Sequence, residues 1–319
     1  MMPGGGKPVA IGIDIGGTSV KLGAVDEKGV VLARGRVPVY REIPFQDFLS
    51  AVYAAVDELI KTVGKIDAIG IGVPGVPDPE TGRLRGRCPA LPSLMEGSLS
   101  DILGNHYGVP AKVRNDAVGA TYGEMRHGAG RPFKRFALFT LGTGIGGAMV
   151  IDGKVIDGPN GLSPQFGCMS MDPARTDIAN PVPGMLENLA SASAVVRRYR
   201  ALNPDVETPD AKTVCDRAKA GEAIAVQVID ETAKWLGQAI GIMSNMLNIE
   251  AAIIGGGLAL AGDFLIDQIA KYTYGFVLPL PGRPPKILQA ETGNDAGVIG
   301  ASVLALDLLA QVQPATRRS

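Results

Sequence analysis

A turn rich in glycine near the start of this 319-residue chain has the residue types that bind phosphate. Asp14 ends an apolar run and is followed by Gly16, Gly17 and Thr18. Because glycine lacks a side chain, backbone N–H groups in such a turn can approach phosphate oxygens closely, and Thr18 adds a hydroxyl donor. Asp14 is placed to face a magnesium ion, directly or through water. A hairpin turn that merely requires glycine would have the same sequence, so this turn alone does not establish a nucleotide site.

A second turn, residues 142–147, formally satisfies the pattern G-x-G-x-x-G. A dinucleotide-binding site would need these glycines to open a helix. Residues 148–151 instead read as a strand that ends in an Asp-Gly turn. We therefore expect a second hairpin that holds phosphate through Gly142, Thr143 and Gly144.

A third turn, residues 255–257, lies between a buried strand and a helix expected at about 259–270. Backbone N–H groups at a helix N-terminus bind anions, so Gly256 and Gly257 are candidates for a nucleotide contact. Close packing of a strand against a helix explains these glycines equally well.

The elements around these turns alternate between strands and helices. Apolar runs at 9–15, 20–25 and 30–33 indicate antiparallel strands, and spacings of three and four indicate a helix over 45–61. Further strands are expected at 66–73, 136–141, 148–151 and 251–254, and helices at about 117–126, 226–247 and 296–309. The chain is therefore of the α/β class.

The order strand, glycine turn, strand, Asp-x-Gly turn occurs twice, near residues 15 and 145. Two copies of one phosphate-facing hairpin predict two related lobes with a cleft between them. We place the smaller lobe at residues 1–116 with about 297–319, and the larger lobe at 117–296.

The composition excludes several classes of function. The formal net charge is −1, and no basic run that would mark a nucleic-acid arm is present. We expect no apolar stretch to reach the roughly 18 residues of a membrane helix, and the first seven residues do not have the pattern of a signal peptide. The three cysteines are widely spaced, which fits a reducing compartment, so we expect a cytoplasmic protein without nucleic-acid or membrane partners.

The ordered motif set resembles that of the ROK family (repressors, open reading frames and sugar kinases), of the hexokinase–actin superfamily. The motifs are residues 13–18, 72–75, 115–117, 141–147, 253–257 and 295–301, and the resemblance runs from about residue 9 to 309. It implies two lobes of the ribonuclease-H-like, actin-like ATPase fold, with ATP and Mg²⁺ in the interlobe cleft beside a sugar hydroxyl that becomes phosphorylated. We also expect Lys21, in the strand after the first turn, to contact the nucleotide.

Asp116 corresponds to the catalytic base of the family by motif position, and Asn115 and Gly75 to sugar-binding residues. Asp116 stands where a strand ends and a helix begins. A helix N-terminus favours an ionised carboxylate, so Asp116 should be charged and able to accept a proton. The alternative is that Asp116 is simply the helix N-cap, a role that suits aspartate.

The sugar-facing half departs from the family pattern. Family kinases usually carry Glu-x-Gly-His after the second phosphate turn, where this chain has Gln165, Phe166, Gly167 and Cys168. The loop that supplies zinc-binding cysteines in the family, residues 172–184 here, contains no cysteine. A structural zinc site needs four N or S ligands, so we predict that this chain binds no zinc.

Glu187 matches a second sugar-contacting glutamate of the family, although a solvated glutamate at a helix start would look the same. Glutamine in place of glutamate removes a charge and adds a donor, and cysteine in place of histidine removes a strong donor. Such exchanges in a sugar pocket change which hydroxyls can be paired, so Gln165 and Cys168 point to altered specificity rather than lost activity.

The expected activity is ATP-dependent phosphorylation of a hexose or hexose derivative, with glucose as the default of the resemblance. One alternative is a kinase for an unusual or N-acylamino sugar, and another is an inactive regulator that binds sugar or nucleotide. The repressors of the family carry a helix-turn-helix ahead of the first glycine turn, for which there is no room here. A homodimer is expected by analogy with the family.

Overall fold

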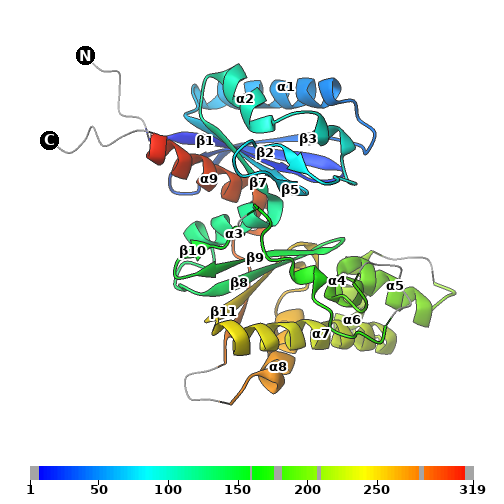
Figure 1. Cartoon of the computed structure of the whole chain (residues 1–319). Coiled ribbons are helices and arrows are strands. Elements are labelled where there is room, and N and C mark those ends of the chain that lie inside the picture. The colour runs from blue at the N-terminus through cyan, green and yellow to red at the C-terminus, as the bar shows by residue number, and fades with distance from the viewer. Residues whose placement is uncertain (1–6, 159, 176–181, 207–209, 280–283, 313–319) are drawn as a thin grey trace. The chain divides into compact units, whose positions relative to one another are not determined.

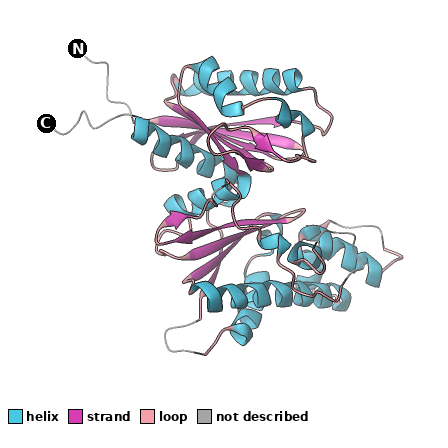
Figure 2. Cartoon of the chain, viewed as in Figure 1, coloured by secondary structure: helices cyan, strands magenta, loops and turns pink. Residues whose placement is uncertain are grey.

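The structure, a computed structural model, describes residues 7–158, 160–175, 182–206, 210–279 and 284–312. The chain divides into two compact units, each built around a five-stranded sheet (Figures 1 and 2). The first unit comprises residues 1–131, 157–163 and 294–319, and the second comprises 132–156 and 164–293.

The sheet of the first unit joins an antiparallel hairpin to parallel strands. Its strands, in spatial order, are β3 (Val31–Pro38), β2 (Ser19–Asp26), β1 (Val9–Ile15), β4 (Ala68–Val73) and β7 (Ala111–Asn115). Strands β1, β4 and β7 run parallel, so their carboxyl ends meet at one edge. The remaining elements of this unit are α1 (Phe45–Val63), α2 (Leu99–Tyr107), α3 (Asp116–His127), α9 (Ala296–Val312), the short strands β5 (Val76–Pro77) and β6 (Leu84–Arg85), and the 3₁₀ turns at Pro92–Glu96 and Gly293–Asp295.

Alternation of residue size along β1 fixes what packs on each face of this sheet. Ile11 and Ile13 face the apolar core that includes residues of α1. Gly12 faces α9 instead, and a Cβ there would lie 2.0 Å from the carbonyl oxygen of Val298. Gly70 of β4 is under the same constraint, because its Cβ would lie 1.7 Å from the carbonyl oxygen of Ala301. The glycines therefore let α9 pack directly on the sheet.

The second unit repeats the strand order of the first. Its sheet consists of β10 (Lys154–Val155), β9 (Ile145–Ile151), β8 (Phe136–Leu141), β11 (Ala251–Gly255) and β12 (Lys286–Gln289). Here too an antiparallel hairpin adjoins parallel strands, which confirms the repeat inferred from the two glycine turns. Its helices are α4 (Leu186–Ala190), α5 (Ala192–Leu202), α6 (Ala211–Lys219), α7 (Ala223–Leu247) and α8 (Asp263–Phe276), with 3₁₀ turns η2 (Phe166–Cys168) and η3 (Gly257–Ala261).

Helix α3 lies in the first unit, and not in the larger lobe expected for residues 117–126. It packs closely on α9, since a Cβ on Gly300 would lie 1.7 Å from the carbonyl oxygen of Gly119. Residues 157–163 also belong to this unit, and Arg114 pairs with Asp157 at 2.8 Å. Neither contact can be read from local sequence, because the partners are far apart along the chain.

The expectation that no stretch is long and apolar enough for a membrane helix is wrong for one segment. Residues 293–312 form a 20-residue helical segment with a mean hydropathy of 1.5. Val298, Ala301 and Ala305 of this segment are buried within the first unit, and α9 packs on β1 and β4. Its apolar composition is thus that of a core helix, because a buried core helix can be as long and as apolar as a membrane-spanning one.

Candidate functional site

Two aspartates of the first unit lie at the carboxyl edge of its parallel strands. In the register of the sheet, Asp14 of β1 pairs with Gly72 of β4, and Val73 pairs with Asn115 of β7. Asp116 follows directly as the first residue of α3. A Cβ on Gly72 would lie 3.4 Å from the Cα of Asp116 and 3.8 Å from Oδ1 of Asp14, so both residues border this glycine. The fold therefore brings together the two carboxylates that the sequence singled out.

Asn115, not Asp116, is the N-cap of α3. Its Oδ1 accepts hydrogen bonds from the N–H groups of Ala117 at 3.1 Å and Val118 at 3.4 Å. Its Nδ2 donates to the carbonyl oxygen of Gly75 at 3.0 Å, so Asn115 also ties down the turn after β4. The alternative that Asp116 serves simply as the cap is wrong, because the preceding residue already fills that role.

Burial raises the pKa of Asp116 to about 6, and the nearby charge of Asp14 adds to the rise. A hydrogen bond from the Ala117 N–H at 2.8 Å acts in the opposite direction but is the weaker influence. The helix N-terminus favours the charged form, as expected, but desolvation by burial outweighs it. Asp116 is still mostly ionised at pH 7, yet it holds a proton far better than an ordinary aspartate, as a general base should.

The raised pKa predicts a specific pH profile. A carboxyl group with a pKa of about 6 is protonated below that pH and can no longer accept a proton. We therefore expect kcat/KM of a reaction that uses Asp116 as its base to fall about tenfold per unit below about pH 6 and to be level from about pH 7 to 8. Initial rates at constant ionic strength measure this profile, and an acid limb near pH 4 would contradict it.

Asp14 lies against the first turn of α9. A Cβ on Gly297 would lie 2.3 Å from Cγ of Asp14, so only glycine fits there. Burial raises the pKa of Asp14, and the charge of Lys21 partly offsets this rise. Nζ of Lys21 donates to Oδ1 of Asn294 at 2.8 Å and to its carbonyl oxygen at 3.2 Å, which joins β2 to the turn before α9.

The first glycine turn leaves its tip open to solvent. Gly17 and Thr18 are exposed, and Gly16 donates its N–H to the carbonyl oxygen of Ser19 at 3.0 Å. The turn thus presents a hydroxyl and backbone beside Asp14, as a phosphate contact requires.

These carboxylates suit a hard divalent cation. Mg²⁺ prefers oxygen ligands and keeps several waters, so one or two carboxylates are enough to hold it. Asp14 and Asp116 are two partly buried carboxylates whose charges disfavour each other, and a cation between them would relieve that cost.

The second glycine turn, in the other unit, is braced by Glu187. Oε2 of Glu187 accepts the N–H of Ile145 at 2.9 Å, and a Cβ on Gly144 would lie 2.2 Å from the same oxygen. The carbonyl oxygen of Gly142 accepts the N–H of Ala192 at 2.9 Å. Glu187 is half-buried, so the alternative of a freely solvated glutamate is wrong.

Gln165 precedes the 3₁₀ turn η2 and Cys168 ends it, and both residues are exposed. The turn lies next to Glu187, because a Cβ on Gly167 would come within 3.3 Å of the Glu187 side chain. Partial burial raises the pKa of the Cys168 thiol, and the charge of Glu187 adds to this effect. Phe166 anchors the turn by packing on Phe139, with ring centroids 4.7 Å apart. The second unit therefore groups its three expected sugar-facing residues beside the second phosphate turn.

Gly256 has a packing role that accounts for its lack of a side chain. Its φ is 84°, and a Cβ would lie 2.5 Å from the carbonyl oxygen of Leu141. The expected helix does not follow directly, because η3 intervenes and α8 begins only at Asp263. The helix-terminus argument for this turn is therefore wrong. A Cβ on Gly257 would meet no atom within 4 Å, so Gly257 is the residue of the pair with room for a ligand.

A cavity of about 550 Å³ beside the second turn contains residues that the sequence analysis missed. It is lined by Thr143 together with Arg197 and Arg200 of α5 and Asp210 before α6. Two guanidinium groups near a phosphate-type turn suit an anionic ligand. The only sequence signal was the basic run in residues 197–200, which reads equally well as a solvated helix face.

The absence of zinc stays a prediction. Within the described ranges, no group of three or more His, Cys, Asp or Glu side chains could hold a metal ion, while part of the loop 172–184 lies outside those ranges. We expect elemental analysis of protein purified without chelators to find far less than one zinc per chain. Stoichiometric zinc that survives dialysis would contradict this.

The comparisons with known proteins agree over nearly the whole chain. The model of the ROK family matches residues 10–308. The glucokinase of Halalkalibacterium halodurans is 32% identical over 311 residues, which cover 92% of this chain and 94% of that protein. The N-acetyl-D-glucosamine kinase of Pectobacterium atrosepticum is 28% identical over 305 residues, covering 92% and 98%. The crystal structure of a ROK family glucokinase from Streptomyces griseus, in complex with glucose and AMPPNP, has a TM-score of 0.81 and 29% identity, covering 94% of this chain and 99% of that one.

Proposed function

The chain belongs to the ROK family, and from this premise we propose that it is an ATP-dependent sugar kinase. It transfers the γ-phosphoryl group of ATP to a hydroxyl of a hexose or hexose derivative, with glucose as the first candidate. The observation that carries the proposal is the carboxylate of Asp116 beside Asp14, with a pKa raised to about 6. Such a carboxylate is mostly ionised at neutral pH, yet it binds a proton more tightly than an ordinary aspartate. It is therefore suited to accept the proton of a sugar hydroxyl.

In the proposed reaction Asp116 first orients the hydroxyl. As the hydroxyl oxygen bonds to the γ-phosphorus, the bond from that phosphorus to the bridging β-oxygen breaks and ADP leaves. The hydroxyl proton passes to a carboxylate oxygen of Asp116. Because the transition state of phosphoryl transfer is loose, positioning of the hydroxyl and stabilisation of charge account for most of the rate enhancement.

Mg²⁺ is proposed to bind at Asp14, directly or through water, where it would neutralise charge on the phosphates. Nucleotide binding is proposed to use both glycine turns and the third turn: Gly16, Gly17, Thr18 and Lys21, then Gly142, Thr143 and Gly144, then Gly256 and Gly257. Of these, Gly17, Thr18 and Gly257 have the strongest support, since each has open space or solvent beside it.

Sugar binding is proposed to use Gly75, Asn115, Gln165, Cys168 and Glu187. The Asn115 amide donates to the carbonyl oxygen of Gly75, and the Asn115 side chain also hydrogen-bonds Asp116, so it joins two other proposed site residues. The exposed Gln165 and Cys168 can meet a ligand without rearrangement of the core. The relationship to an N-acetyl-D-glucosamine kinase supports the second candidate, a kinase for an N-acylamino sugar.

We also propose that the protein works in the cytoplasm as a homodimer, without nucleic-acid or membrane partners. Four apolar side chains, on α7 and at and just beyond the end of α8, support a dimer: Ile242, Met246, Phe276 and Leu278 are 40, 74, 38 and 57% exposed. Asn245 links the two elements through hydrogen bonds to the backbone of residues 276 and 278. Sedimentation equilibrium measures the state, and a monomer at micromolar concentration would contradict it.

A coupled assay of ADP release over a panel of hexoses and N-acylamino hexoses tests the function. One sugar should stimulate ADP release far above the rest. If no sugar does so while sugar or nucleotide still raises the melting temperature, the chain is a binding regulator and the kinase proposal is wrong.

A further inference from the structure

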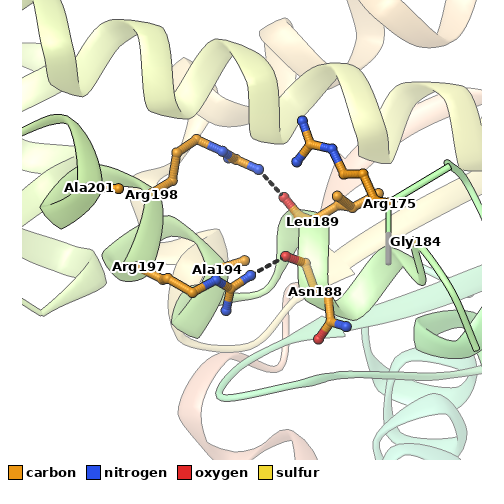
Figure 3. Close-up of a pocket in the computed structure, with 8 residues that line it drawn as sticks. All are labelled: Arg175, Gly184, Asn188, Leu189, Ala194, Arg197, Arg198 and Ala201. Carbon is orange, nitrogen blue, oxygen red and sulfur yellow. Dashed lines mark hydrogen bonds between the residues drawn. The ribbon is translucent and has the colours of Figure 1, made fainter. Parts of the chain in front are cut away.

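Three arginines of the second unit surround a cavity of about 290 Å³ that contains none of the proposed site residues (Figure 3). They are Arg175, which lies in the segment between η2 and α4, and Arg197 and Arg198 of α5. Figure 3 shows that Arg197 and Arg198 point toward the carboxyl end of α4, where Asn188 and Leu189 lie. None of these contacts involves a side chain of the proposed site.

The segment between η2 and α4 is closed at its base by backbone hydrogen bonds. Leu186 donates its N–H to the carbonyl oxygen of Met169 at 2.8 Å, and Met171 donates to that of Gly184 at 2.9 Å. Ser170 and Met185 form a bridge between these bonds. Because Cys168 precedes this base and Glu187 follows it, any shift of the base moves both residues.

Arg175 connects this segment to α7. Its Nε lies 3.2 Å from Asp172 within the segment, and its Nη2 lies 3.7 Å from Glu231 of α7. Its guanidinium also lies over the ring of Trp235, 5.9 Å from the centroid. The backbone carbonyl of Arg175 accepts the N–H of Gly184 at 3.0 Å, so both the side chain and the backbone hold the base.

Arg198 connects the same carboxylate to α4. Its Nε lies 3.2 Å from Oε2 of Glu231, and its Nη1 donates to Thr232 of α7 at 3.0 Å. Its Nη2 donates to the carbonyl oxygen of Leu189 at 2.6 Å, and Arg197 donates in the same way to that of Asn188. The side chain of Arg198 is only 13% exposed, so its contacts are screened less by water than those of a surface ion pair.

We propose that the ion-pair network of Arg175, Glu231 and Arg198 holds Glu187 and Cys168 in position. Glu231 links two guanidinium groups, one from the segment before α4 and one from the helix after it. Glu187 thereby reaches the N–H of Ile145 at the second glycine turn from a fixed helix. This inference rests on the proposed function, because it assigns the positioned residues to the sugar.

The experiment compares the variant Arg175→Gln with the wild type in the full-length protein. Loss of the charge frees the segment from α7 but leaves the core intact, so KM for the preferred sugar should rise about five- to tenfold. KM for ATP and kcat should stay within about twofold. Arg175→Lys, which keeps the charge, should restore most of the sugar KM. An unchanged sugar KM, or equal rises in both KM values, would overturn the inference.

Arg135→Gln is the matched control. Arg135 belongs to the same unit, is similarly exposed (40% against 44%), and pairs with Asp152 at 2.8 Å far from α4 in sequence. Its loss removes an ion pair of the same kind without touching the network, so both KM values should match those of the wild type.

Trp235, the only tryptophan of the chain, gives a readout that does not depend on turnover. It contacts Arg175 and lies 3.4 Å from Glu231 through Nε1, so its emission reports on the network itself. Addition of glucose, or of the preferred sugar, should change the emission of the wild type and of Arg135→Gln, with an apparent Kd about five- to tenfold weaker in Arg175→Gln. If the wild type phosphorylates no sugar, the kinase proposal fails. The fluorescence titration then still tests whether the network positions the residues that bind sugar. An equal Kd in Arg175→Gln, or no response in any of the proteins, would overturn the inference.

Discussion

Replacing Asp116 with asparagine is expected to lower kcat by about 10³-fold, within the range found for loss of a general base. Asparagine keeps the size and the hydrogen bond from Ala117 but cannot accept a proton. Since Asn115 caps α3, the helix start should survive the exchange. The measurement is the rate of ADP release at saturating ATP and sugar, together with nucleotide affinity by calorimetry, which should remain near that of the wild type.

The same variant should be as stable as the wild type or more so. Burial raises the pKa of Asp116 from its usual value near 3.8 to about 6, so the folded state loses stability relative to the unfolded state as pH rises from about 4 to about 6. At neutral pH the asparagine variant avoids this cost, which we expect to be on the order of 1–3 kcal/mol in urea unfolding.

Asp47→Asn provides the control, because Asp47 lies in the first turn of α1 in the same unit. It should leave kcat unchanged and should not stabilise the protein. Retained turnover in Asp116→Asn would remove Asp116 from its catalytic role, and a large loss of stability would mean that the carboxylate is structural.

Replacing Asp14 with asparagine is expected to lower kcat/KM for MgATP by about 10²–10³-fold, the loss expected when a pre-placed electrostatic group is removed. The half-buried Asp14 is held between Lys21 and the first turn of α9, so its carboxylate is placed before a ligand arrives. Asparagine keeps one oxygen but loses the charge that holds a hard cation. A magnesium titration at fixed ATP should show that the variant needs several-fold more Mg²⁺ for half-maximal rate.

Asp26→Asn is the control for Asp14→Asn. Asp26 ends the same hairpin at its opposite end, where its Oδ1 accepts the N–H groups of Lys28 and Val30 at 2.9 Å. Its loss should reduce stability without changing the magnesium requirement. An Asp14→Asn protein with the wild-type magnesium dependence would show that the cation binds elsewhere.

The places of Asp14 and Asp116 in the fold could be predicted from the sequence, because both residues lie at strand ends. Asp14 lies near the end of β1 and Asp116 directly after β7, and parallel strands bring their carboxyl ends to one edge. The alternative role of Asp116 as the N-cap was wrong by one residue, since a cap is defined by backbone angles that Asn115 and Asp116 could each adopt. The direction of the Asp116 pKa was also missed, because desolvation depends on tertiary packing.

Long-range contacts account for most of what the sequence did not reveal. The pairing of Arg175 and Arg198 with Glu231 joins residues more than 30 positions apart, so no local pattern marks it. The same is true of Gly256, whose need for glycine comes from the carbonyl oxygen of Leu141 rather than from a ligand. The apolar helix 293–312 reads as a buried element only once the glycines of β1 and β4 are seen against it.

The central claim is that this chain moves a phosphoryl group from ATP to a sugar with the help of Asp116. Phosphorus NMR of the wild-type protein with MgATP and the sugar that best stimulates ADP release tests it most directly. We expect the γ-phosphate signal of ATP to decline while a phosphomonoester signal grows at the same rate, and neither change to occur at a comparable rate with Asp116→Asn. Growth of free phosphate in place of the phosphomonoester, or equal rates in the two proteins, would contradict it.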